Sequence, residues 1–125
     1  MSNPVPSEIT YHRSSRVLEI TFSTGDRFEF GAEYLRVYSP SAEVRGHGPG
    51  QEVLQIGKEN VCIDRIEPVG NYAVRLCFDD GHDTGLYSWE ELYELGCEKE
   101  RLWREYLKRL EASGHKRTRP DSLKT

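Results

Sequence analysis

The sequence predicts an α+β domain in which an antiparallel β meander or sheet packs against C-terminal helices as a two-layer sandwich. Apolar and polar residues alternate with period two in residues 9–30 and again in residues 72–78, which is typical of strands. Residues 98–113 instead repeat apolar residues at helical spacing. Strands therefore come first along the chain and helices last, an order typical of α+β domains.

Residues 9–30 are expected to form a meander of three strands. Leu18, Ile20 and Phe22 fall on one face of the middle strand, and the residues between them fall on the other. Two polar stretches separate the strands as turns: Arg13-Ser14-Ser15 and Thr24-Gly25-Asp26.

A short helix is expected in residues 32–37. Pro40 forces Ser39 away from helical geometry, so the helix ends before this point. Residues 41–55 lack periodicity, which indicates an irregular connector, and four chain-breaking residues lie close together in it: Gly46, Gly48, Pro49 and Gly50.

A second group of strands follows. Residues 61–69 have the composition of a strand, and residues 72–78 alternate more regularly than any other part of the chain. Gly70-Asn71 forms the turn between them. Residues 84–87 are expected to form a further short strand.

Two helices complete the domain. Ser88 and Glu91 have the three-residue spacing of a capping box, in which Ser88 accepts a hydrogen bond from a free backbone N–H. Gly96 is expected to end this helix. The second helix covers about residues 98–113, and its apolar stripe consists of Leu102, Trp103, Tyr106, Leu107 and Leu110.

The 125 residues are enough for one domain with a core of its own. Residues 1–7 are expected to be a flexible lead, and residues 8–113 the folded domain. Residues 114–125 lack apolar periodicity and carry four basic residues against one acid: Lys116, Arg117, Arg119 and Lys124 against Asp121. This basic tail is expected to be a disordered solubilising end, with an electrostatic contact to an acidic partner as the alternative.

Composition restricts the classes of partner. The chain carries 17 basic and 21 acidic residues, a net charge of −4, so binding to nucleic acid is not expected. No apolar run is long enough to span a membrane, and the first residues lack the features of a secretory signal. Cys62, Cys77 and Cys97 are an odd number at wide spacing, which is typical of reduced thiols and favours a cytoplasmic location.

The densest polar stretch joins a strand to a helix and contains the run Asp79-Asp80-Gly81-His82-Asp83-Thr84. Its histidine and carboxylates are groups that bind metal ions. Zinc, however, takes about four ligands in a tetrahedral array, and no CxxC or HxxxH pattern accompanies the turn. An Asp-Gly turn with exposed acids is the simpler interpretation.

His47 lies in a glycine-rich stretch that lacks the lysine and the flanking strand and helix of a phosphate-binding loop. It joins His82 in one site only if this loop folds back. Cys77 needs a base and a lowered pKa to act as a nucleophile, and a buried free thiol is the simpler interpretation. The residues by themselves support no specific reaction.

Three stretches share their order and spacing with a known family: residues 35–48, which begin Leu35-Arg36-Val37-Tyr38, then residues 61–78 and residues 79–92. They resemble the gamma-butyrobetaine hydroxylase-like N-terminal domain, formerly a domain of unknown function, over about residues 8–98. The chain is similar to stand-alone bacterial members. In the carnitine-pathway dioxygenases of eukaryotes, this non-catalytic domain precedes the catalytic jelly roll and carries a zinc held by three cysteines and a histidine. A related domain is attached to a plastid ATPase that carries iron–sulfur clusters.

The resemblance carries over only one of these zinc ligands. The family's cysteine positions correspond to Ser39, Ser41 and Val44, and its histidine corresponds to His82. Serine hydroxyls are poor zinc ligands and valine is none. We therefore expect a hydrogen-bonded cluster of Ser39, Ser41 and His82 to replace the metal, with Glu43 as a nearby acceptor. The candidate binding residues are Ser39, Ser41, Glu43, His47, Asp80 and His82.

The leading functional expectation is a non-enzymatic accessory module without a cofactor that contacts a protein partner. The relatives place such a module in iron–sulfur or other metalloprotein handling. The alternative is a metal-binding domain in which His82, His47 and nearby carboxylates hold zinc or iron in a rearranged site. A small enzyme built on the His82 turn is a third alternative, and the chain is compatible with a homodimer. An exposed apolar patch favours the first, stoichiometric metal the second, and a deep closed pocket the third.

Overall fold

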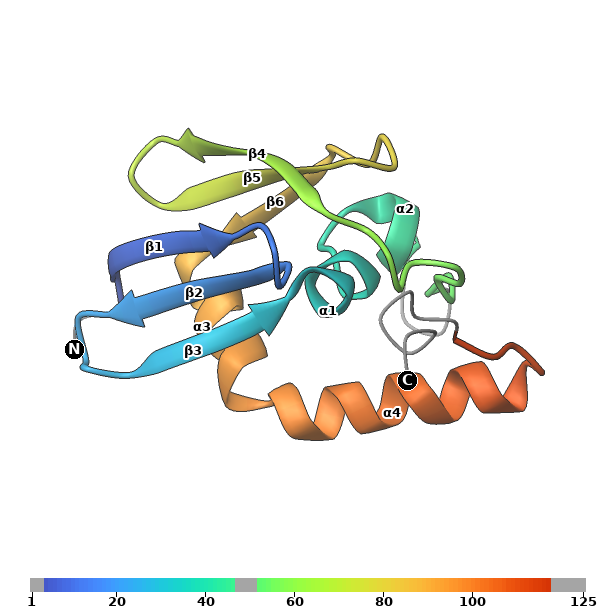
Figure 1. Ribbon diagram of the computed structural model, residues 1–125. Helices are drawn as coiled ribbons and strands as arrows, with labels where there is room; N and C mark the ends of the chain where they lie inside the picture. The colour runs from blue at the N-terminus through green and yellow to red at the C-terminus, as the bar shows by residue number, and fades with distance from the viewer. Residues whose placement is uncertain (1–3, 47–51, 118–125) are drawn as a thin grey trace.

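The computed structural model describes residues 4–46 and 52–117. Its strands form two three-stranded antiparallel sheets, β1-β2-β3 and β4-β5-β6, and helices lie beside them (Figure 1). The elements in chain order are β1 (Pro6–His12), β2 (Val17–Phe22), β3 (Arg27–Gly31), α1 (Ala32–Val37), α2 (Ala42–Arg45), β4 (Ile63–Val69), β5 (Ala73–Phe78), β6 (Gly85–Ser88), α3 (Trp89–Cys97) and α4 (Lys99–Ala112). The α+β class is confirmed, and the predicted strands are divided between two sheets.

The middle strand of the first sheet buries the predicted face. Leu18, Ile20 and Phe22 are each at most 1% exposed. Leu18 pairs across the ladder with Phe30, and Ile20 pairs with Phe28. These cross-strand pairs bring apolar and aromatic side chains together on the core face, which stabilises the register.

The middle strand of the second sheet is buried on both faces. Val74, Leu76 and Phe78 face the core, and Ala73 and Cys77 on the opposite face are buried as well, whereas Arg75 between them is exposed. One core cluster joins side chains of both sheets with side chains of α1 and α3. The two sheets therefore share one core.

α3 links the two sheets because it contacts both β6 and β3. It begins at the predicted cap, where Ser88 Oγ accepts a 3.1 Å hydrogen bond from Glu91 N–H. The prediction that Gly96 ends the helix is wrong, since α3 continues to Cys97. Gly96 instead lies directly against the Phe28 ring, and a Cβ at this position would overlap the ring. The glycine therefore serves close packing between α3 and β3.

α4 packs against α1 in a second, smaller core cluster of Val37, Tyr106 and Leu110. Figure 1 shows it running along the lower side of the domain, beyond the first sheet. Tyr106 Oη donates a 2.6 Å hydrogen bond to the carbonyl of Gln55, which fastens the segment before β4 to this helix.

Three local features differ from the sequence expectation. Residues 114–117 fall in the expected disordered tail, but the structure describes them, and Arg117 forms a salt bridge with Glu33. β1 begins at Pro6, so the last two residues of the expected flexible lead belong to a strand. The segment expected to be irregular contains the short helix α2, which Ser41 caps by accepting from Glu43 N–H. Among residues 4–46 and 52–117, no helix combines the length and the apolar composition that a membrane span requires.

Replacing Gly96 with alanine is expected to destabilise the fold, because the added methyl group must displace the Phe28 ring. We expect Gly96→Ala to lower the free energy of unfolding by about 1–3 kcal/mol in urea titrations. Gly31→Ala is the matched control, since a Cβ there meets no atom within 4 Å. It should change stability by less than about 0.5 kcal/mol. Equal stabilities of the two variants would contradict the packing role of Gly96.

Candidate functional site

The polar side chains that the sequence singled out gather where the α1–α2 connection meets the turn between β5 and β6. Ser39 follows α1, and Ser41 begins α2. His82 lies in the β5–β6 turn and is 6% exposed. We refer to Ser39, Ser41, Glu43, His82 and Thr84 as the His82 cluster.

Both ring nitrogens of His82 are hydrogen-bonded. Nε2 lies 2.9 Å from Ser39 Oγ, and Nδ1 lies 2.9 Å from Glu43 Oε1. Because a carboxylate only accepts, Nδ1 carries the proton and Nε2 accepts from the Ser39 hydroxyl. Burial, followed by the positive charge of Arg36, lowers the pKa of His82 and outweighs the opposite effect of Glu43 and Asp80. The ring is therefore held in its neutral form.

The hydroxyl groups complete the network around Glu43. Ser41 Oγ and Thr84 Oγ1 are 2.7 Å apart, and Thr84 Oγ1 also donates to Glu43 Oε1 at 3.2 Å. Ser39 Oγ accepts from Ser41 N–H at 3.2 Å. The loop after α1 and the turn after β5 are thus joined by side chains that lie more than 40 residues apart in the sequence.

Gly85 makes room for Ser39. A Cβ at Gly85 would clash with Ser39 Oγ, because the two atoms would lie only 2.4 Å apart. The neighbouring Tyr87 has no exposed surface, and its hydroxyl donates a 2.5 Å hydrogen bond to the Leu35 carbonyl. β6 therefore positions the end of α1 directly against the cluster.

Asp80 supports the cluster from the other side of the turn. Its Oδ2 accepts from Arg36 Nε and from Lys58 Nζ, both at 2.8 Å, and its Oδ1 accepts from His82 N–H at 3.1 Å. Burial would raise the pKa of Asp80, but the hydrogen bonds from Lys58, His82 N–H and Arg36 outweigh it and lower the pKa to about 2. Arg36 also donates to Gln55 Oε1 at 3.0 Å.

Ser39, His82 and Glu43 have the connectivity of a hydrolase triad. A nucleophilic serine must reach a substrate carbonyl, and Ser39 has no exposed surface. Its hydroxyl is also shared with the Ser41 N–H. These contacts support a structural role for the Ser39 hydroxyl.

The cluster does not fit the zinc site implied by the family resemblance. Val44 is a buried apolar side chain, and the hydroxyls of Ser39 and Ser41 are engaged within the cluster. Both nitrogens of His82 are also engaged. In the described parts of the chain, no three His, Cys, Asp or Glu side chains are grouped so that they could hold a metal ion.

The structure brings Ser39, Ser41, Glu43 and His82 together through hydrogen bonds, and Asp80 contacts this cluster through the His82 backbone. His47 lies outside the described residues. Sequence reasoning missed Thr84, Arg36 and Lys58 as members of the surrounding network. Arg36 and Thr84 lie within the stretches that carry the family resemblance, which was the available signal, whereas no pattern marked Lys58.

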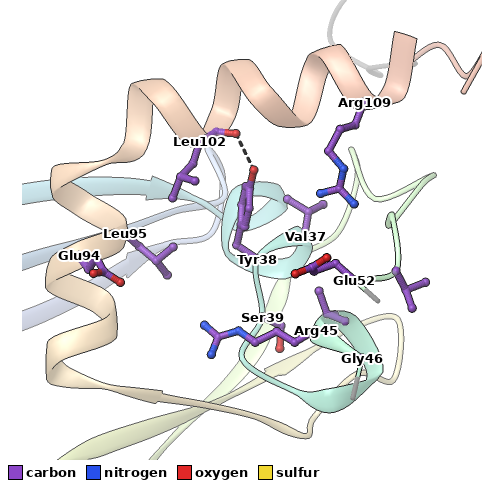
Figure 2. A pocket seen from close by; sticks show the side chains of 12 residues that line it. Val37, Tyr38, Ser39, Arg45, Gly46, Glu52, Glu94, Leu95, Leu102 and Arg109 are labelled. Carbon is purple, nitrogen blue, oxygen red and sulfur yellow. Dashed lines mark hydrogen bonds between the residues drawn. The ribbon is translucent and has the colours of Figure 1, made fainter. Parts of the chain in front are cut away.

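A groove of about 640 Å³ lies beside the cluster, between α1 and α2 on one side and α3 and α4 on the other (Figure 2). The Tyr38 side chain lines the groove and reaches α4, where its Oη donates a 2.7 Å hydrogen bond to the Leu102 carbonyl. We call it the α2–α4 groove. Its apolar lining residues are Val37, Tyr38, Val44, Val53, Leu95 and Leu102, and its charged lining residues are Arg45, Glu52, Glu94 and Arg109.

The depressed pKa of Asp80 predicts a loss of stability in acid. The unfolded chain takes up this proton near its ordinary value of 3.8, whereas the folded chain takes it up near 2. Asp80 thus contributes about 2 kcal/mol to the free energy of unfolding above about pH 5. This contribution is lost as the pH falls through 2. In urea unfolding, the loss of stability between about pH 5 and 2 should be about 2 kcal/mol smaller in Asp80→Asn than in the wild type. Asp83→Asn, at an exposed position in the same turn, should keep the wild-type pH dependence.

The engaged nitrogens of His82 predict that this histidine holds no stoichiometric metal. Untagged protein purified without chelators should contain less than about 0.1 zinc or iron per chain by elemental analysis, and His82→Ala should give the same value. About one metal per chain in the wild type, lost in the variant, would contradict this and establish a rearranged site.

Comparison with known proteins agrees with the resemblance read from the motifs. The family described as Gamma-butyrobetaine hydroxylase-like, N-terminal, matches residues 9–93. No curated protein matches the chain.

Solved structures share both sequence and fold with this chain. Two NMR solution structures each have a TM-score of 0.80. One is 52% identical and covers 94% of this chain and 88% of its own. The other is 47% identical and covers 93% and 91%.

A crystal structure of a protein with unknown function from Acidithiobacillus ferrooxidans, assigned to the DUF971 family, is 38% identical with a TM-score of 0.64. It covers 76% of this chain and 98% of its own. The chain described here therefore belongs to the gamma-butyrobetaine hydroxylase-like N-terminal domain family.

Proposed function

We propose that this domain is a non-enzymatic accessory module that binds a segment of another protein in the α2–α4 groove. The observation that carries the proposal is the groove itself, whose lining is mainly apolar. Val53 lines the groove and is 52% exposed, and Ile56, three residues further along the chain, is 50% exposed. Exposed apolar side chains beside a groove are typical of sites that bind other proteins.

The charges of the groove restrict the segment that it accepts. Glu94 of α3 and Arg109 of α4 lie at opposite ends of the groove in Figure 2. Arg45 is engaged by Glu91 at 2.6 Å. The segment that complements these charges has an apolar side chain at its centre, a basic residue facing Glu94 and an acidic residue facing Arg109.

Other features support the remaining parts of the proposal. The buried and hydrogen-bonded Ser39 supports a domain without catalytic activity. The three cysteines are free thiols, which supports a reducing, cytoplasmic environment. The family resemblance supports a partner that handles iron–sulfur clusters or other metal centres, because a related domain is attached to an ATPase that carries such clusters.

Selection from a random peptide library with the full chain tests the groove. We expect enriched peptides with an apolar centre and flanking charges of opposite sign. Val53→Lys and Arg109→Glu should each weaken their binding at least about tenfold, which corresponds to about 1.4 kcal/mol. Leu86→Lys is the matched control, because Leu86 is a partly exposed apolar residue on β6 that does not line the groove.

Circular dichroism of the three variants would confirm that each is folded. Peptides that bind Val53→Lys and Arg109→Glu as tightly as the wild type would assign the interaction to another surface. A selection that enriches no peptide would likewise contradict binding of a short segment.

A further inference from the structure

The chain reverses direction after α4 and folds back over it, as the red segment in Figure 1 shows. His115 N–H donates to the Leu110 carbonyl, and Gly114 N–H donates to the Glu111 carbonyl. Gly114 has a φ of +82°, a conformation that favours glycine. Together these features form a Schellman motif, which directs the residues after it toward α1.

The reversal places the guanidinium of Arg117 against Glu33 of α1. Arg117 Nε donates to Glu33 Oε2 at 2.8 Å, and Nη2 donates to Glu33 Oε1. The same guanidinium lies 5.2 Å from the ring centroid of Trp103 on α4. The edge of the planar guanidinium thus pairs with both oxygens of the carboxylate, and its face stacks on the aromatic ring.

Glu33 requires this partner because it is only 9% exposed. A buried carboxylate without a compensating charge strongly destabilises the folded state. Within residues 4–46 and 52–117, Arg117 is the one basic side chain in a salt bridge with Glu33. The Glu33 carboxylate and the Trp103 ring therefore favour a planar cation between them.

The site is accessible from outside. A cavity of about 310 Å³ adjoins the guanidinium and is lined in part by Gly31, Tyr34 and Lys99. The Arg117 side chain keeps 20% of its surface exposed. An incoming side chain can thus reach Glu33 and Trp103 once Arg117 has moved away. This site shares no lining residue with the α2–α4 groove.

We infer that Glu33 and Trp103 form a binding site for an arginine side chain of a partner protein, and that Arg117 occupies this site in the free chain. Arginine is selected over lysine, because only its planar fork pairs with both carboxylate oxygens while it stacks on the indole ring. The occupant is a partner rather than a second copy of this chain. Arg117 lies three residues beyond Gly114, and the Schellman motif directs it to Glu33 of its own chain.

Competition between the internal and the added arginine tests the inference. The indole N–H signal of Trp103 in the ¹⁵N-labelled full chain is followed by NMR during titration with N-acetyl-L-argininamide. In Arg117→Ala the signal should shift saturably, with a dissociation constant at least about tenfold below that of the wild type, because the internal competitor is gone. The matching lysine derivative should bind at least about tenfold more weakly.

Trp89 provides an internal control, since its Nε1–H donates to the Asn71 carbonyl away from this site. The double variant Glu33→Gln/Arg117→Ala should lose the response. If Arg117→Ala does not fold, Arg117→Lys retains a cation without the fork and should still bind the arginine derivative more tightly than the wild type.

Three results would overturn the inference. The first is the absence of a saturable Trp103 shift in the folded Arg117 variants. The second is an equal response to the lysine derivative. The third is a concentration-dependent dimer of the wild type that Arg117→Ala abolishes, because this would assign the site to a second copy of the chain.

Discussion

The Asp80 carboxylate is the contact on which the arrangement of the polar site depends. It accepts from Arg36 on α1, from Lys58 before β4 and from the backbone of His82 in its own turn. Arg36 is only 7% exposed, so its charge needs a partner inside the protein. One side chain thereby sets the distance between α1, the segment before β4 and the β5–β6 turn. The position of His82 relative to Ser39 follows from that distance.

The His82 cluster keeps the loop and the turn together through hydrogen bonds between side chains. Its neutral imidazole donates to Glu43 and accepts from Ser39, so both nitrogens serve as hydrogen-bonding groups. A network of this kind stabilises a buried polar site only when each member has a partner. Here the hydroxyls of Ser41 and Thr84 supply the remaining contacts. The chemically distinctive residues of the sequence therefore organise the fold, and the proposed binding functions lie on the surfaces beside them.

Both proposed binding surfaces depend on the hydrogen bonds that join α1 and its C-terminal end to α3 and α4. Tyr34 Oη donates to the Leu95 carbonyl, and Tyr38 Oη donates to the Leu102 carbonyl, each at 2.7 Å. Burial raises the pKa of the Tyr38 hydroxyl, so it stays protonated and remains a donor. These bonds fix the helices on either side of the α2–α4 groove and next to Trp103. A surface that is already ordered loses less entropy when a partner binds.

The sequence by itself determined the local elements of this protein. Period-two alternation located the strands, and the spacing of Ser88 and Glu91 located the start of α3, because both patterns reflect backbone geometry and burial that act over a few residues. The family resemblance predicted that Ser39 and His82 lie close together. Only the tertiary structure decided that Arg36 meets Asp80, that the glycine inside α3 packs against a ring, and that Arg117 meets Glu33. Each of these contacts joins positions brought together by packing, and no local pattern records which residues will meet.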